Sequence, residues 1–173
     1  LKQHKIYIPN ENMLSKTQGL FVWNYFHSNI VQDIVPIMLG DQEEFPYLKD
    51  KSIYFVTKLS SEKAEVPVKY ALIEIADELP RFIVLPGDKQ NTYLILLDDV
   101  IRYCLNDIFY IYDFDKVEAY TIKLTRDAEL DFDDDIYTSF IEKVSNSLER
   151  RKQGQPVRFV YDASMPEDLL NIL

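Results

Sequence analysis

A dense run of carboxylates begins directly after Arg126 in this chain of 173 residues. Carboxylate oxygens are preferred ligands of Mg²⁺ and Ca²⁺, so one interpretation of the run is a hard-cation site. It lacks the glycine and the terminal glutamate of an EF-hand loop. A helix predicted at about 134–151 follows, with basic residues at its far end, and this arrangement complements the helix dipole. We therefore favour a solvated helix start and predict no metal site. The acidic residues are Asp127, Glu129, Asp131, Asp133, Asp134 and Asp135.

Two charged residues interrupt apolar strand patterns. Arg126 continues the alternation of Ile122 and Leu124 at the end of a predicted strand. Glu74 is embedded in the apolar run ALIEI. An unpaired buried charge is costly, so each residue needs a partner. For Arg126 we favour a structural contact with a carboxylate at the sheet rim, and contact with a phosphate from a larger protein is the alternative. Arg126, Asp127 and Glu74 are thus the structural or phosphate-facing candidates.

Residues suited to nucleophilic or acid–base chemistry are few. His4 lies near the start of the chain, and His27 follows Trp23 by four positions at the edge of an apolar helical stripe. Both are predicted to be boundary residues rather than ligands or phosphoryl acceptors. The single cysteine, Cys104, precedes Leu105 in a helical pattern typical of a small core residue. The phosphate-loop pattern G-x-x-x-x-G-K-[ST] and the G-x-S-x-G elbow do not occur. We predict no catalytic, cofactor-binding or metal-binding residue in this chain.

The segments that position these residues predict an α+β fold. Residues 15–18 (SKTQ) fit a capping box that opens a helix, which should end before Pro36. A second helix is predicted with Asp98 or Asp99 as its cap. The apolar runs ALIEI, RFIVL and YLILL indicate central strands covered on both faces. We expect a single domain with a mixed, largely antiparallel sheet of short strands packed by about three helices. The predicted strands cover 4–8, 52–59, 68–75, 81–85, 93–97, 117–124 and 156–161.

Composition limits the function classes. The chain carries 19 basic and 29 acidic residues, a net charge of −10, which disfavours binding of nucleic acid or another polyanion by this domain alone. Hydrophobic residues make up 47% of the chain, enough for a packed core. The sequence shows neither a signal peptide nor an apolar run of 18 residues. A cytoplasmic location is therefore expected, and membrane association of a longer parent protein is left open.

Several segments, in order along the chain, resemble the middle or head domain of bacterial polyphosphate kinase. The sharpest are RYCLNDIF at 102–109 and TRDAE at 125–129. The resemblance covers nearly the whole chain and includes a helix that looks like the opening segment of that domain. The matching segments are FVWNYFHSNIVQDIVPIML (21–39), YALIEIADELPRFIVLP (70–86), LILLDDVIRYCLNDIF (94–109), AYTIKLTRDAELD (119–131) and PVRFVYDASMP (156–166).

The resemblance implies a parent enzyme that reversibly transfers the terminal phosphate of ATP to polyphosphate. In that family a phosphohistidine, Mg²⁺ and arginines act in two later domains, and an earlier helical domain helps to hold the nucleotide. The resemblance implies that residues 1–173 form the middle domain alone, without those regions and without a cofactor of its own. Its implied partners are the other domains of the polypeptide and a second subunit, because this domain is associated with dimer formation. ATP, ADP and polyphosphate would be bound by the parent.

Two functional interpretations follow. In the first, the chain is the structural and dimerisation domain of a polyphosphate kinase and is inactive alone. In the second, it is an independent α+β interaction module without kinase activity. Phosphoryl transfer depends on positioning and on neutralising negative charge, which a chain of net charge −10 is poorly suited to supply. We favour the first interpretation.

Overall fold

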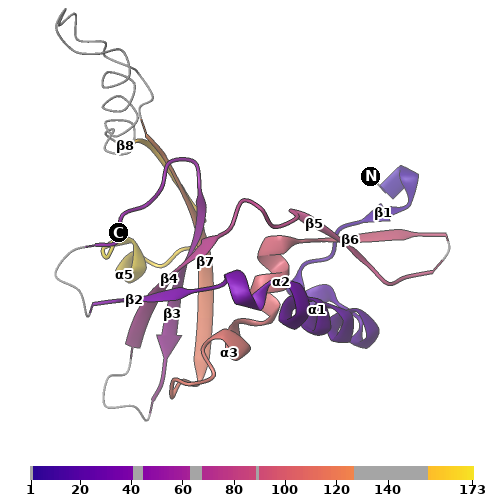
Figure 1. Ribbon diagram of the computed structural model, residues 1–173, viewed down its shortest axis with the longest axis horizontal. Helices are drawn as coiled ribbons and strands as arrows, with labels where there is room; N and C mark the ends of the chain where they lie inside the picture. The colour runs from indigo at the N-terminus through magenta and orange to yellow at the C-terminus, as the bar shows by residue number, and fades with distance from the viewer. Residues whose placement is uncertain (1, 41–44, 63–67, 89, 127–155) are drawn as a thin grey trace, which may run out of the picture.

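The computed structural model describes residues 2–40, 45–62, 68–88, 90–126 and 156–173. These residues form two β-sheets, with the longer helices packed between the small sheet and one face of the large sheet (Figure 1). The first residues lie beside the small sheet, and the last residues lie beside the large one (Figure 1). None of the helices in these ranges is long and apolar enough to cross a membrane.

The large sheet is antiparallel throughout, in the order β2-β4-β3-β7-β8. Its central strand β3 pairs with β4 on one side and β7 on the other, so that Phe55 lies opposite both Ile73 and Thr121. The sheet is covered on both faces at its centre, because the neighbouring residues Phe55 and Val56 point to opposite faces and both are fully buried. The strands are β2 (Pro36–Leu39), β3 (Ile53–Ser60), β4 (Val68–Ile75), β7 (Lys116–Arg126) and β8 (Pro156–Tyr161).

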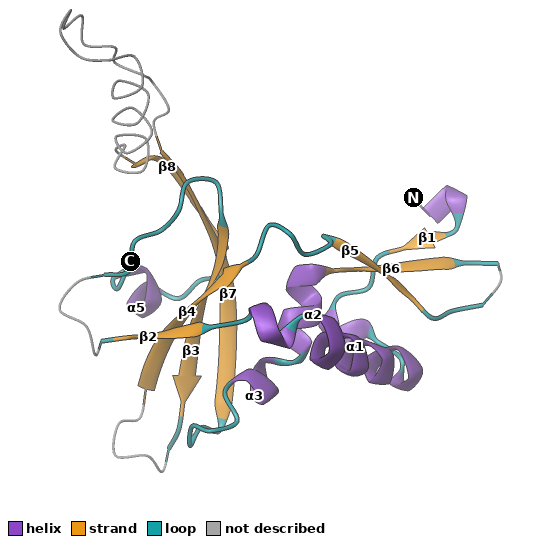
Figure 2. Cartoon of the chain, in the orientation of Figure 1, coloured by secondary structure: helices purple, strands orange, loops and turns teal. Residues whose placement is uncertain are grey.

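Helices cover the two faces of the large sheet unequally. On one face, α1 (Lys16–Asn29), α2 (Leu97–Tyr103) and α3 (Leu105–Ile108) contribute to the larger core, which includes Phe26 and Phe55. On the other face, the short helix α5 (Glu167–Leu170) packs Leu169 into a smaller core with Val56 and Ile122. Figure 2 shows α5 apart from the other α-helices, on the opposite side of the strands.

The small sheet joins distant parts of the chain. Strand β1 (Ile6–Tyr7) pairs in parallel with β6 (Thr92–Leu96), and β6 pairs antiparallel with β5 (Phe82–Leu85). Three short 3₁₀-helices complete the described elements: η1 (Lys2–His4), η2 (Glu11–Met13) and η3 (Val31–Asp33). In the segment from η1 to η2, strand β1 therefore adds an edge strand to the small sheet, and the two 3₁₀-helices lie on either side of it in the sequence.

The structure confirms the α+β class and most of the predicted elements. Ser15 is the N-cap of α1, and its hydroxyl and the Gln18 side chain form the reciprocal hydrogen bonds of a capping box. The strand predicted at 68–75 and the one predicted at 156–161 have those bounds. Cys104 is buried in the larger core, as its helical pattern predicted.

Three predictions differ from the structure, and one strand was missed. There are two sheets rather than one. Asp98 and Asp99 do not cap α2: Leu96 is its N-cap and both aspartates lie in the first turn, because β6 runs directly into the helix. RFIVL is covered on one face only, since Ile83 and Leu85 are buried whereas Phe82 and Val84 on the other face of β5 are 56% and 63% exposed. Strand β2 was not predicted at all. The helix predicted at about 134–151 lies outside the described residues.

Candidate functional site

The segment 47–50 connects both of the charged candidates that lie within the described residues. The Arg126 guanidinium donates from Nε and Nη2 to the carbonyl oxygen of Leu48, each at 3.2 Å. It also stacks on the Tyr47 ring, with Cζ 4.6 Å from the ring centroid. The Asp50 carboxylate accepts a hydrogen bond from the Arg126 backbone N–H at 2.8 Å. These contacts fix the end of β7 to the segment that leads into β3. A contact between the guanidinium and a carboxylate stays a prediction, and Asp127 lies outside the described residues.

Glu74 takes a different partner from the same segment. Its Oε1 atom lies 2.8 Å from Lys49 Nζ, and this hydrogen bond raises the pKa of Lys49. Both side chains line a hollow of about 390 Å³, together with the carboxylates Asp33, Asp77 and Glu78. The ammonium group of Lys49 lies against the Glu74 carboxylate, where a metal cation bound by Glu74 would have to lie. Within the described ranges, no three His, Cys, Asp or Glu side chains are placed to hold a metal ion.

The histidines and the cysteine are placed as structural residues. Asp107 Oδ2 accepts a hydrogen bond from Trp23 Nε1 at 2.7 Å and lies 3.1 Å from His27 Nε2. This cluster ties the end of α1 to α3 at a half-buried position. His4 is exposed in η1. Burial raises the pKa of the Cys104 thiol to about 12, so the reactive thiolate is disfavoured there.

A buried carboxylate joins the N-terminal segment to α2. Asp99 is 9% exposed, and its carboxyl group lies close enough to Glu11 of η2 for the two to affect each other's ionisation. Burial, with a smaller contribution from the charge of Glu11, raises the pKa of Asp99 to about 6. Arg102 opposes this rise, with Nη1 3.5 Å from Asp99 Oδ1. Arg102 is itself fixed by a 2.8 Å hydrogen bond from Nη2 to Thr121 Oγ1.

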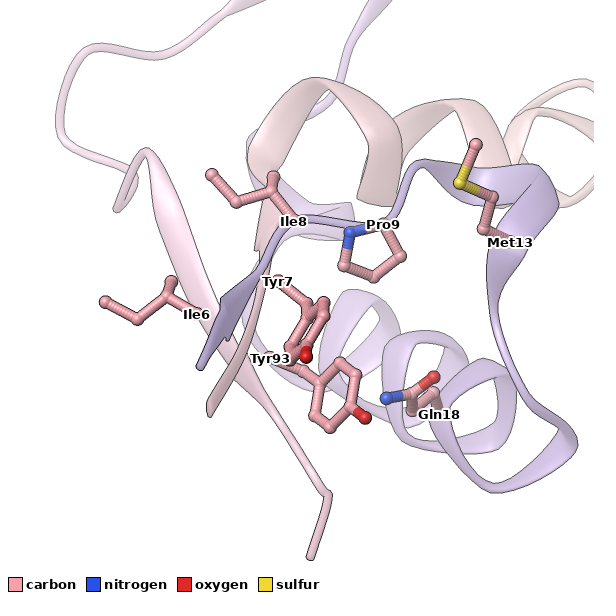
Figure 3. Close-up of a pocket in the computed structure, with 7 residues that line it drawn as sticks. All are labelled: Ile6, Tyr7, Ile8, Pro9, Met13, Gln18 and Tyr93. Carbon is pink, nitrogen blue, oxygen red and sulfur yellow. The ribbon is translucent and has the colours of Figure 1, made fainter. Parts of the chain in front are cut away.

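A hollow lies between the N-terminal segment, β6 and the start of α1. It has a volume of about 400 Å³ and a mostly apolar lining. The rings of Tyr7 and Tyr93 stack with centroids 5.3 Å apart, and Figure 3 shows them side by side, flanked by Pro9 and Gln18. We call this site the tyrosine hollow; its lining residues are Ile6, Tyr7, Ile8, Pro9, Met13, Gln18 and Tyr93.

The Gln18 side chain at the tyrosine hollow is already engaged, and the hydroxyls of Tyr7 and Tyr93 are the other polar side-chain groups of the lining. Gln18 Nε2 donates to the Pro86 carbonyl at 3.2 Å, and Gln18 Oε1 accepts from the Ser15 backbone N–H at 3.1 Å. Gly87 leaves room for Tyr93, because a Cβ atom at position 87 would lie 2.6 Å from Tyr93 Cδ2. The site therefore suits a mainly apolar group, and its lining contains no histidine, cysteine or carboxylate.

Sequence reasoning did not identify the tyrosine hollow. The signals that could have located it are weak, because Tyr7 and Tyr93 are 86 positions apart and meet only through the parallel pairing of β1 with β6. Pro9 and Met13 lie outside any regular apolar period. The charged candidates were easier to recognise, since a charge within an apolar strand is visible in the sequence itself.

The geometry defines a two-sheet α+β domain with an apolar hollow and with charged residues in structural contacts. A family model described as "Polyphosphate kinase middle domain" matches residues 17–173. The chain therefore belongs to the polyphosphate kinase middle-domain family.

Individual relatives agree with this assignment. The chain is 40% identical to a polyphosphate kinase of Vibrio vulnificus and 37% identical to one of Escherichia coli K12, over 178 residues in each case. Both alignments cover 100% of this chain and 25% of the relative. The crystal structure of polyphosphate kinase from Porphyromonas gingivalis has a TM-score of 0.74 at 24% identity, covering 99% of this chain and 24% of that one, and it supports the fold. The chain thus spans about a quarter of the length of its curated relatives.

Proposed function

We propose that this chain is the non-catalytic middle domain of a polyphosphate kinase that reversibly transfers the terminal phosphate of ATP to polyphosphate. The proposal rests on one observation: the whole chain matches about a quarter of the length of proteins that are named polyphosphate kinase. The phosphohistidine and the Mg²⁺ and nucleotide sites belong, in this proposal, to the remaining parts of the polypeptide. The domain positions those parts and contributes to contact between subunits.

The local chemistry supports the absence of a catalytic role for this domain. A phosphohistidine needs an accessible ring nitrogen near a phosphate site, whereas His27 Nε2 faces Asp107 at 3.1 Å. Phosphoryl transfer also requires positive groups around the phosphates. Among the described arginines, Arg81 and Arg102 pair with Asp98 and Asp99. The Arg126 guanidinium donates to the carbonyl oxygen of Leu48.

Strand β8 provides the surface that we assign to subunit contact. It lies at the end of the described strand order of the large sheet and carries four exposed apolar side chains. Apolar side chains grouped on a surface are typical of protein–protein contacts. The residues are Val157, Phe159, Val160 and Tyr161.

Activity measurements test the catalytic part of the proposal. The 173-residue chain and the full parent polypeptide are incubated with ATP, Mg²⁺ and polyphosphate, and ADP release and phosphohistidine labelling are measured. We expect turnover and labelling with the parent only. Labelling of the 173-residue chain would contradict the proposal.

Sedimentation equilibrium of the parent tests the assembly role. Phe159→Glu should shift the parent towards monomer, because a charge would be buried at the contact. Tyr110→Glu, at a residue that is 79% exposed in another region, is the matched control and should leave the assembly unchanged. If both variants remain dimers, β8 does not form the contact between subunits.

A further inference from the structure

The tyrosine hollow is built from one part of the chain that lies before the family match and one part that lies within it. Its outer wall consists of residues 6–13, which precede the family match at 17–173. Its inner wall consists of Gln18 on α1 and Tyr93 on β6, which lie within the match. The hollow therefore lies where the middle domain meets the polypeptide before it.

The outer wall is held in place by the domain. The backbone N–H of Thr92 donates to the carbonyl of Lys5 at 2.9 Å, and β1 pairs with β6 through Ile6 and Tyr7. These backbone contacts hold the outer wall against β6.

The exposed lining specifies the chemistry of an occupant. Tyr7, Ile8 and Met13 are 37%, 42% and 69% exposed. The amide of Gln18 is already used at both ends, so the two tyrosine hydroxyls are the polar side-chain groups left to an occupant, and most of the lining offers it only apolar contact. An apolar side chain entering the hollow would instead remove apolar surface from water.

We infer that the tyrosine hollow is the docking site for apolar side chains of the polypeptide that precedes Leu1 in the parent protein. The family match describes a middle domain, so polypeptide lies on both sides of it in the family. The chain enters at η1, which directly precedes β1 in the outer wall of the hollow (Figure 1). A segment tethered at this point has a high effective concentration at the hollow, which favours it over a free partner. This inference rests on the proposed function, because it places the chain within the longer enzyme.

Photo-crosslinking from within the hollow tests the occupant. Met13→p-benzoylphenylalanine is introduced into the full parent polypeptide, and Tyr110→p-benzoylphenylalanine is the matched control at an exposed residue outside the hollow. After irradiation, mass spectrometry identifies the attached peptide. We expect the position 13 probe to attach to residues before Leu1 of the same polypeptide, and the position 110 probe to attach elsewhere. Attachment to later residues, to a second copy, or to no peptide would overturn the inference.

Hydrogen exchange provides a second measurement without a bulky probe. Amides at 6–8 and 92–95 should exchange about tenfold more slowly in the parent than in the 173-residue chain, because docking protects both strands. Met13→Glu should remove this difference, and Tyr110→Glu should retain it. Equal exchange in the parent and the chain, or protection that depends on protein concentration, would overturn the inference.

Activity separates the two proposals. Phosphotransfer by the same parent preparation reports on the proposed function independently of the hollow. An active parent with an unprotected hollow would refute the docking inference and leave the proposed function intact. A parent without phosphotransfer would refute the proposed function, whatever the state of the hollow.

Discussion

The buried carboxylate of Asp99 should make the stability of this domain depend on pH, and Asp99→Asn should remove that dependence. Asp99 lies in the first turn of α2 and is 9% exposed. The charged groups around it are Glu11 and Asp98, which disfavour its ionisation, and Arg102, which favours it. Because burial is the largest cause, the folded state binds the proton more tightly than the unfolded chain does.

The magnitude follows from the two pKa values of Asp99. The pKa rises from 3.8 to about 6 in the folded state. At about 1.4 kcal/mol per tenfold change in proton affinity, this difference corresponds to roughly 3 kcal/mol. A carboxyl group with a raised folded pKa contributes fully to stability below its unfolded pKa, and this contribution is lost as pH rises through the folded pKa. The loss therefore falls between about pH 4 and pH 6.

Asp99→Asn carries no charge at any of these pH values, and its amide can still donate to Glu11. Its free energy of unfolding should match that of the unmodified chain near pH 4 and exceed it by about 3 kcal/mol near pH 8. Urea unfolding of both chains over this range, monitored by Trp23 fluorescence, measures the difference.

Asp98→Asn is the matched control on the same turn. Asp98 Oδ1 lies 2.9 Å from Arg81 Nη1, so its replacement removes an ion pair and should give no comparable gain at pH 8. Parallel pH profiles for the unmodified chain and Asp99→Asn would refute the reasoning. A loss of stability in Asp99→Asn at pH 8 would also refute it.

Three further substitutions test the packing, the helix start and the sheet rim. Phe26→Ala should lower the free energy of unfolding by about 3–5 kcal/mol, since the ring is fully buried; a loss below about 1 kcal/mol in urea unfolding would argue against this core. Ser15→Ala should cost about 1 kcal/mol by removing the capping hydrogen bond, and an unchanged thermal midpoint would contradict that role. Arg126→Lys should cost about 1 kcal/mol because it loses the forked contact with Leu48 and the stacking on Tyr47. Equal urea midpoints for Arg126→Lys and the unmodified chain would show that these contacts do not contribute to the free energy of unfolding.

Local patterns predicted the elements whose structure is decided locally. The capping box at Ser15 and Gln18 needs only four residues, and it forms as predicted. Strands β4 and β8 were recognised from short apolar and β-branched runs bounded by polar residues. These features depend on residues that are neighbours in the sequence, so one amino-acid sequence is enough to identify them.

Long-range pairing was not predictable in the same way. The division into two sheets arises because β5 and β6 pair with each other and not with a strand of the large sheet, and β1 joins them across 86 positions; no local pattern encodes these choices. The exposure of Phe82 and Val84 was equally hidden, because an apolar run does not reveal whether other elements cover both faces of its strand. Similarly, Glu74 was recognised as needing a partner, but its partner Lys49 comes from a loop whose position is set by the fold.

The divided pairing of β7 has a consequence for synthesis on the ribosome. Residues 116–123 of β7 pair with β3, whereas residues 122–126 pair with β8. The hairpin of β3 and β4 therefore emerges with one open hydrogen-bonding edge, and β7 arrives only after β5, β6, α2 and α3 have been made. An uncovered strand edge with apolar side chains is prone to aggregation during such a delay. Nascent chains that stop before Lys116 should accordingly bind holding chaperones, and chains that extend beyond Tyr161 should release them.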